Sequence, residues 1–170
     1  MLRTIRQRLT ASLRSGAEPS WWMNRVMQEV IPFNRPHRIQ MVKVAQEEVV
    51  VLLPLRRRNT NHLGTMHACA LATAAEYASG LCVLATLDMS THRLIMSDLQ
   101  VTYPRRAESN CRVKAEWGDE SRQRALQELE QTGRHQFQMK SVVFDETGEV
   151  VAEALVTWHV KRLTSRGEKK

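Results

Sequence analysis

Alternation of apolar and polar residues predicts the strands in the second half of this chain. The segment NCRVKAEW (110 to 117) places an apolar residue at every second position between charged ones, which is the period of a half-buried strand. The segments QFQMKSVVF (136 to 144) and EVVAEALVTWHV (149 to 160) flank the turn DETG, so they are predicted to form a hairpin of two long strands. In the second of these, one face carries Ala152, Ala154, Val156, Trp158 and Val160.

Three further apolar or β-branched segments predict strands earlier in the chain. EEVVVLLP (47 to 54) is rich in valine, and LCVLATLD (81 to 88) is a short apolar run. SDLQVTY (97 to 103) places Leu99, Val101 and Tyr103 on one face. Together with the alternating segments, these predict five to six strands, most of them antiparallel.

Helices are predicted in three places. The first region, residues 2 to 30, ends at IPFNRPHR, where Pro32 and Pro36 prevent continuation. The second opens at Gly64 and Thr65 and runs to Gly80; six of the sixteen residues 65 to 80 are alanine, which suits close packing. SRQRALQELEQTG (121 to 133) predicts a short exposed helix that ends at a glycine. A single small-residue helix among so many strands indicates an α+β fold, with an antiparallel sheet curled around that helix.

The net charge of +7 is concentrated at the two ends of the 170-residue chain. Residues 1 to 17 and 161 to 170 hold nine of the 25 basic residues and one of the 18 acidic ones, which leaves 16 basic and 17 acidic residues between them. We therefore interpret the ends as solvated tails and expect no specific binding of nucleic acid. The arginine-rich residues 1 to 17 also have the composition of a mitochondrial transit peptide, although their leucine and isoleucine spacing equally fits an ordinary amphipathic helix.

The three cysteines indicate a reducing compartment. Cys69, Cys82 and Cys111 are odd in number and lack CxxC-type spacing, which argues against a disulfide framework and against a zinc site. No apolar run in the sequence predicts a membrane span, and residues 1 to 17 lack the apolar core of a secretory signal. We expect a cytoplasmic protein with no metal and no cofactor.

Glu76 lies in the middle of the predicted alanine-rich helix, where a carboxylate is unexpected. Burial of an unpartnered carboxylate costs several kcal/mol or forces it to hold a proton, so either Glu76 lies at an edge or a site is built around it. On a helix, Cys69, Ala72, Thr73, Glu76 and Gly80 share one face, and His67, Leu71, Ala74, Ala78 and Leu81 share the other.

The residues around this helix resemble those of the hotdog-fold thioesterases, and more narrowly the PaaI-like and DUF4442-type acyl-CoA thioesterases. The family pattern is an Asn, a Gly and a His at a helix start, with an acidic residue nine positions after the His. Here Asn61, Gly64, His67 and Glu76 match that pattern and its spacing. The segment YPRRA (103 to 107) matches a later YxxxA segment of the family. The resemblance covers residues 40 to 163 and leaves an N-terminal helical extension (1 to 39) and a basic tail (164 to 170).

The resemblance implies hydrolysis of an acyl-CoA thioester, with coenzyme A as part of the substrate, by a homodimer or a dimer of dimers. Glu76 would be the general base, and Asn61 would hold the attacking water. The free backbone N–H groups of Met66, His67 and Ala68 at the helix start would polarise the thioester oxygen. Family members usually carry two glycines after the His, where this chain has Ala68 and Cys69. Alanine keeps the N–H donor and adds a methyl group.

Each site residue also has a purely structural interpretation. Asn61 and Gly64 fit an ordinary turn, His67 fits a helix-start residue, and Thr73 either orients the carboxylate of Glu76 or only packs. Arg105 and Arg106 either bind the phosphates of coenzyme A or form a charged strand end. Two other functions stay open: a non-catalytic acyl-CoA-binding or sensor module, and a hydratase-type enzyme, which would need a His and a carboxylate to converge on one substrate carbon.

Overall fold

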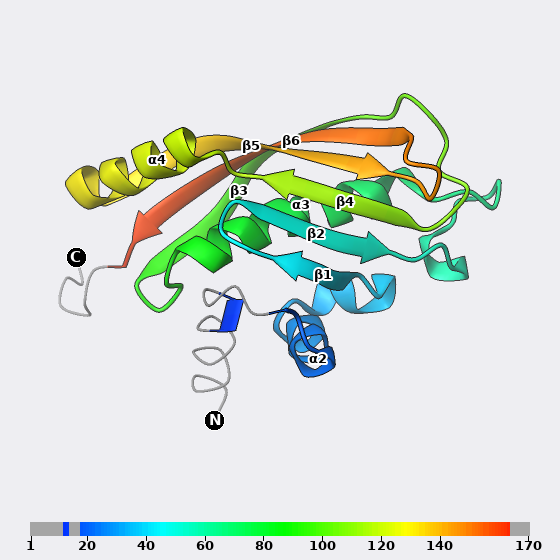
Figure 1. The fold of residues 1–170 in the computed structure, drawn as a ribbon, viewed down its shortest axis with the longest axis horizontal. Coiled ribbons are helices and arrows are strands. Elements are labelled where there is room, and N and C mark those ends of the chain that lie inside the picture. Colours follow the sequence, from blue (N-terminus) through cyan, green and yellow to red (C-terminus); the bar gives the residue numbers. More distant parts are fainter. Residues whose placement is uncertain (1–11, 14–17, 164–170) are drawn as a thin grey trace.

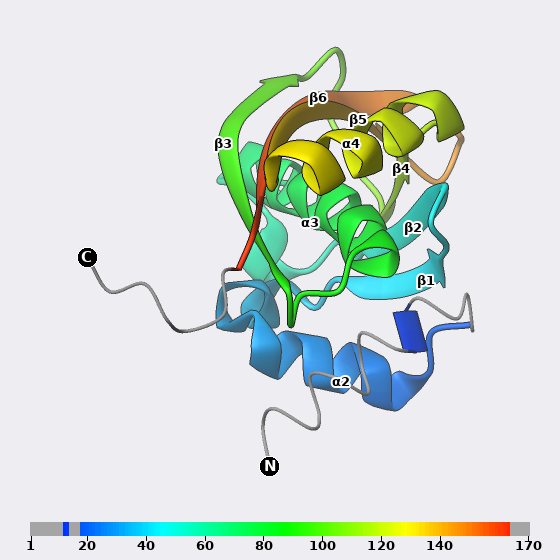
Figure 2. The same cartoon turned by 90° about the vertical axis from the view of Figure 1, so that its left-hand side faces the viewer.

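A six-stranded antiparallel sheet wraps around one long helix (Figures 1 and 2). The computed structural model of the protein describes residues 12–13 and 18–163. The strand order is β1-β2-β4-β5-β6-β3, and every neighbouring pair is antiparallel. The strands are β1 (Gln40–Val44), β2 (Glu48–Leu53), β3 (His92–Thr102), β4 (Cys111–Glu116), β5 (Arg134–Phe144) and β6 (Val150–Arg162). This is the hotdog architecture expected from the sequence.

Helix α3 (Ala68–Thr86) forms the centre of the core. Twelve of its nineteen residues are buried, and many of these are alanine, so the sheet can approach the helix closely. Ser141 of β5 donates a hydrogen bond from Oγ to the Ala75 carbonyl oxygen at 2.9 Å, which ties the sheet to the helix. α3 is long and apolar enough to cross a membrane, but it lies inside the sheet and is a core helix.

Helix α2 (Trp21–Val30) and the short 3-10 helix η1 (Pro32–His37) lie beside β1, outside the layer formed by the sheet and α3 (Figure 2). The side chain of Asn24 accepts a hydrogen bond from the Met41 N–H at 2.7 Å and donates one to the Met41 carbonyl oxygen at 3.4 Å. α2 therefore satisfies part of the free edge of β1. Residues 2 to 11 and 14 to 17 of the predicted N-terminal helical region, and the basic tail, fall outside the described residues.

The structure confirms the strands predicted at 47 to 54, 110 to 117 and in the C-terminal hairpin. Helix α4 (Asp119–Thr132) is also confirmed, and it ends at Gly133 in a left-handed conformation (φ 71°). The strand predicted at 97 to 103 is the second half of β3, which begins earlier, at His92.

Two predictions about local structure were wrong. The segment 81 to 88 is not a strand, because α3 continues to Thr86; Leu81, Cys82, Val83 and Ala85 are buried, and a fully enclosed helix loses the periodicity that distinguishes it from a strand. The sequence also gave no sign of β1, since this five-residue edge strand has an irregular pairing between Met41 and Lys43 that breaks its alternation.

Candidate active site

Glu76 is a half-buried carboxylate on the N-terminal half of α3. Burial raises the pKa of Glu76 to about 7 from an ordinary value of 4.5. Among the described residues, no ion pair and no hydrogen bond reaches its carboxylate oxygens. A carboxylate with a pKa near neutrality is suited to accept a proton at physiological pH, so Glu76 has the properties of a general base.

The start of α3 presents a single backbone donor. Three free N–H groups were expected here, but Met66 donates to the Ala107 carbonyl oxygen at 2.8 Å and His67 donates to the Asn59 carbonyl oxygen at 2.7 Å. The expectation of three free donors was therefore wrong. The next amide, that of Cys69, is capped by His67 Nδ1 at 3.1 Å. In the described part of the chain, the Ala68 N–H between them has no acceptor. Ala68 thus offers the free donor of this helix start.

His67 is the N-cap residue of α3, which begins at Ala68 rather than at Thr65. Its ring nitrogen accepts the Cys69 N–H, and its carbonyl oxygen accepts the first helical amides, those of Ala70 and Leu71. These contacts give His67 a capping role and fix the geometry of the exposed Ala68 amide.

Asn61 closes the loop that leads into α3. Its Oδ1 accepts from the Leu63 and Thr65 N–H groups at 2.9 and 3.3 Å, and its Nδ2 donates to the Thr65 hydroxyl at 2.9 Å. Gly64 in the same loop has a φ of 79°, and a Cβ there would meet no atom within 4 Å. The glycine therefore serves the left-handed turn and leaves its surroundings open. The second hydrogen of Asn61 Nδ2 is the part of this side chain that could hold a water molecule.

Tyr103 and Ala107 of the YPRRA segment hold the start of α3 from the opposite side. The Tyr103 hydroxyl donates to the Ala68 carbonyl oxygen at 3.1 Å, and the Ala107 carbonyl oxygen accepts the Met66 N–H. Sequence reasoning noted this segment only as a family match and gave Tyr103 no role. Its position at the end of a predicted strand could have indicated this role, because a tyrosine hydroxyl usually forms a hydrogen bond with a neighbouring segment.

Asn59 is the second positioning residue that the sequence did not indicate. It is fully buried, its Nδ2 donates to the His37 and Pro54 carbonyl oxygens at 2.9 Å each, and its Oδ1 accepts from His37 Nδ1 at 3.0 Å. Its backbone carbonyl accepts the His67 N–H. Asn59 therefore joins η1, the end of β2 and the α3 start, and a polar residue in a polar loop gives no sequence sign of such burial.

The outward stripe of α3 contains Cys69, Thr73 and Glu76. The Thr73 hydroxyl donates to the Cys69 carbonyl oxygen at 2.8 Å, which leaves it only acceptor capacity toward Glu76. Gly80, which shares this helix face, is buried, and a Cβ there would lie 3.2 Å from Trp158 Cζ2. Trp158 therefore covers the stripe at this point.

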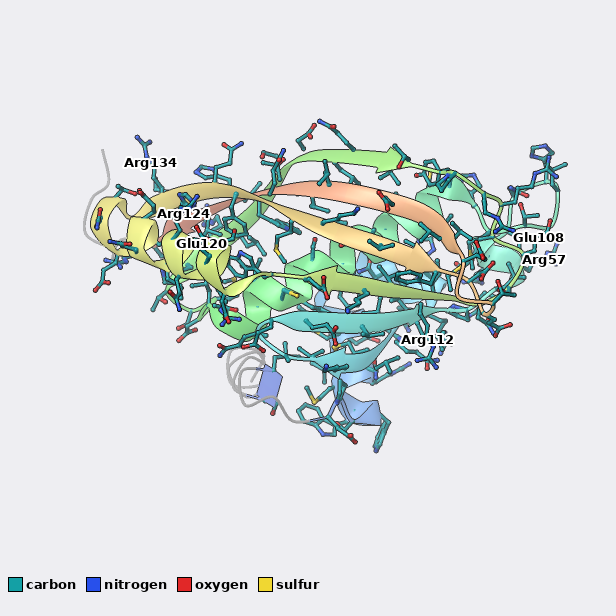
Figure 3. All side chains as sticks on the ribbon, turned by 45° about the horizontal axis from the view of Figure 1, so that its top comes forward. Arg57, Glu108, Arg112, Glu120, Arg124 and Arg134 are labelled. Carbon is teal, nitrogen blue, oxygen red and sulfur yellow. The ribbon has the colours of Figure 1, made fainter. Side chains whose placement is uncertain are left out.

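The two candidate phosphate ligands differ in their surroundings. Arg105 pairs with Glu149 at 2.6 Å, whereas Arg106 is exposed and makes no ion pair within the described residues. The hollow beside them is lined by Glu149 and Glu153, which do not suit a phosphate. Figure 3 shows Arg57 at the same end of the molecule as Glu108, which follows Arg106 by two residues.

No group of three or more His, Cys, Asp or Glu side chains able to hold a metal occurs in the described ranges. Burial raises the pKa of Cys82 to about 12 and that of Cys111 to about 11, so both thiols are inert at neutral pH. Cys69 is exposed beside the Ala68 amide.

Several solved structures are similar to this chain. PA5026 of Pseudomonas aeruginosa, a protein of unknown function described as a probable thioesterase, is 25% identical, with a TM-score of 0.76 over 87% of this chain and 99% of that one. Thioesterase PA1618 of Pseudomonas aeruginosa, in a mutant form, is 15% identical, with a TM-score of 0.68 over 86% of this chain and 97% of that one. Thioesterase HI1161 of Haemophilus influenzae is 13% identical, with a TM-score of 0.64 over 84% and 92%. The last two show the fold alone.

A search of curated proteins found no match. The family model of DUF4442, a domain of unknown function, matches residues 20 to 160, which include the α2–η1 region and the whole sheet except the last two residues of β6. The match thus spans the Ala68 amide, Glu76 and the YPRRA segment, and the protein belongs to the DUF4442 family.

Proposed function

We propose that the protein hydrolyses an acyl-CoA thioester to a free acid and coenzyme A. The observation that carries this proposal is the unpartnered carboxylate of Glu76, with a pKa near 7, on the same helix as the free Ala68 N–H. Base and oxyanion donor are the two groups that acyl transfer to water requires. The fold shared with proteins described as thioesterases supports the same reaction.

In the proposed reaction, the Glu76 carboxylate takes a proton from a water molecule as the water oxygen adds to the thioester carbon. The carbonyl oxygen becomes an oxyanion, which the Ala68 N–H and the positive end of α3 stabilise. The tetrahedral intermediate then collapses, the carbon–sulfur bond breaks, and coenzyme A leaves as a thiolate that is protonated by Glu76 or by solvent. The remaining Nδ2 hydrogen of Asn61 is placed in the loop where it would orient the water.

Two chains are needed to bring these groups together. Ala68 and Glu76 are eight residues apart, so they are separated by about 12 Å along the helix axis. Both groups must lie about 3 Å from the atoms that they serve, which is not possible on one small thioester within a single chain. We infer that Glu76 of the partner subunit acts beside the Ala68 amide, so the protein should be at least dimeric.

Analytical ultracentrifugation combined with activity assays tests this inference. Protein that sediments as a dimer or a dimer of dimers at micromolar concentration, and loses activity on dilution to monomer, is the expected result. A fully active monomer would rule out the shared site while leaving hydrolysis itself in place.

Coenzyme A accounts for the positive side chains around the α3 start. Arg106 is the exposed cation of the YPRRA segment, and Arg105 would have to exchange its contact with Glu149 for a phosphate. The most direct test of the proposed function is a thiol-release assay with a panel of acyl-CoAs that differ in chain length and aromaticity. We expect release of free thiol with at least one of them. Tight binding of acyl-CoA with no thiol release across the panel would show instead a non-catalytic binding module.

A further inference from the structure

Three aromatic side chains project from α2 and η1 into solvent. Trp21 is 81% exposed, Phe33 is 70% exposed and Trp22 is 38% exposed, whereas Trp117 and Trp158 are buried, at 1% and 4%. Exposure of this much aromatic surface in one short region is unusual for a soluble domain and marks an interaction site. We call this surface, formed by Trp21, Trp22, Arg25, Phe33 and Arg35, the α2–η1 face.

The α2–η1 face is not used in packing the domain. Met23 and Met27 form the opposite side of α2 and are buried, and Asn24 binds the backbone of Met41 in β1. With one side fixed to the sheet edge, the helix turns its other side away from the body of the protein (Figure 2). As far as the described residues go, Trp21 and Phe33 are therefore open to a flat partner on the side of α2 that faces away from the sheet.

Cations accompany the aromatic side chains on this face. Arg25 follows Trp21 by four residues and Trp22 by three, so on a helix it is the neighbour of both. Arg25 and Arg35 both pair with Glu29, at 4.0 and 3.7 Å, which links the end of α2 to η1. The Phe33 ring lies 5.7 Å from the ring of His37.

The charge of the whole chain favours an anionic partner for this region. Residues 1 to 58 hold 11 of the 25 basic and 4 of the 18 acidic residues, a net charge of +7, whereas residues 59 to 170 hold 14 of each. Residues 1 to 39, which contain α2 and η1, account for +5 of this charge, with seven basic and two acidic residues, whereas Arg56, Arg57 and Arg58 lie beyond β2. A partner that attracts this region needs negative charge and an apolar layer for the aromatic rings.

We propose that the α2–η1 face docks the protein on an anionic lipid bilayer. Tryptophan and phenylalanine partition into the interface between headgroups and acyl chains, and arginine pairs with lipid phosphates. Neither signal alone gives stable binding, but a basic patch and inserted aromatic rings together do. A single nucleic-acid strand also stacks on aromatic rings, but it needs a groove that follows its backbone, whereas this surface projects. The proposal does not depend on the hydrolase activity.

The intrinsic tryptophans allow a direct test with the full-length protein. We would measure co-sedimentation with vesicles of phosphatidylcholine alone and of phosphatidylcholine with about a third phosphatidylglycerol, and quenching of tryptophan fluorescence by brominated lipids. Because Trp117 and Trp158 are buried in the core, quenching on binding reports Trp21 and Trp22. We expect binding to the anionic vesicles that weakens with added salt, and quenching only when the vesicles are anionic.

Matched substitutions test whether vesicle binding depends on the α2–η1 face or on other parts of the surface. The double variant Trp21→Ala, Phe33→Ala should lose vesicle affinity by about tenfold or more, whereas Leu126→Ala, at an exposed leucine of α4, should not. Arg35→Gln should weaken binding by about fivefold. Its control is Arg124→Gln, which removes an arginine that pairs with Glu120 on α4 at the far end of the molecule (Figure 3). Circular dichroism would verify that each variant is folded.

Three results would overturn the proposal. The first is binding that is equal for neutral and anionic vesicles or unchanged in the double variant. The second is a face covered by a second copy, seen as a change of oligomeric state in the double variant with no vesicle binding by the parent protein. The third is binding of single-stranded nucleic acid that requires Trp21 and Phe33 in the absence of any vesicle binding.

Discussion

The two halves of α3 use the same helix for different purposes. In the C-terminal half, residues 77 to 86, eight of ten residues are buried, and Ser79 Oγ both donates to the Glu76 carbonyl oxygen at 2.8 Å and accepts the Trp158 indole N–H at 3.0 Å. In the N-terminal half, residues 68 to 76, only four of nine are buried, and the Glu76 carboxylate and the Ala68 amide have no partner among the residues that the structure describes. Satisfied polar groups stabilise the C-terminal half, residues 77 to 86, which we call the enclosed half. Unsatisfied polar groups make the N-terminal half, residues 68 to 76, available for chemistry, and we call it the open half.

The largest expected effect on activity comes from removing the charge of Glu76, the last residue of the open half. Glu76→Gln keeps the shape of the side chain and removes the base, so hydrolysis should fall by roughly a hundred- to ten-thousandfold while acyl-CoA binding persists. Thiol release and equilibrium binding would be measured on the same preparation. Glu130→Gln, at an exposed glutamate of α4, is the matched control and should keep the parent rate. Parent activity in the Glu76 variant would contradict the proposed mechanism.

The pH dependence of stability should show how much free energy of unfolding is lost when the buried Glu76 carboxylate becomes charged. The folded-state pKa of Glu76 is about 7 and its unfolded value is 4.5, so the folded protein binds the proton more tightly. The free energy of unfolding should therefore fall as the pH rises from about 4.5 through 7, by about 3 kcal/mol, and activity should rise over the upper part of that range.

Urea unfolding at several pH values would measure this decline in the parent protein and in Glu76→Gln. The difference between the two curves isolates Glu76 from the other titrating groups. We expect the variant to be the more stable of the two above pH 7. Identical pH dependence in both would mean that Glu76 is solvated in the folded protein.

The stability of the protein and the position of the first residues of α3 should depend on Asn59. Asn59→Ala removes the side-chain bonds to His37 and Pro54 and leaves buried carbonyl oxygens without donors, so the protein should lose about 2 kcal/mol of stability. The backbone carbonyl of residue 59 accepts the His67 N–H and is held in place by these side-chain bonds, so its position should shift and kcat should fall more than KM rises. Asn24→Ala, which removes side-chain bonds remote from the α3 start, would show whether loss of stability alone lowers kcat.

The smallest effect is expected in the enclosed half. Ser79→Ala leaves the buried indole N–H of Trp158 without an acceptor, at a cost of about 1 kcal/mol, and should leave the pH profile of hydrolysis unchanged. Ser141→Ala is the comparison, since Ser141 only donates to a helix carbonyl that already accepts an intrahelical bond. A smaller loss of stability in the Ser141 variant is expected, and a shift of the pH profile in the Ser79 variant would contradict the separation of the two halves.

The sequence predicted the open half better than the enclosed one. Glu76 was recognisable because a carboxylate interrupts a run of alanines, whereas residues 81 to 85 are all apolar and fit a strand as well as a helix. The hairpin of β5 and β6 was predictable from its alternation and its turn. Three features of the site could not be read from any local pattern: the capping of α3 by His67, the single free amide of Ala68 and the burial of Asn59. They depend on the way in which the folded chain arranges its hydrogen bonds. The site roles of all the candidate residues, Glu76 and Ala68 included, stay predictions.

The two hydrogen bonds between the Asn24 side chain and the Met41 backbone affect whether further strands can add to the sheet. A β-sheet with two bare margins can add copies on both sides and propagate into a fibril. Here the side chain of Asn24 occupies both backbone groups of Met41 at the β1 margin, while β3 forms the other margin. Extension of the sheet into a second copy is therefore hindered at β1, a five-residue edge strand, and favoured at β3, an eleven-residue edge strand. Asn24 thus opposes addition of a strand at one edge, which favours pairing of two copies over growth of a fibril.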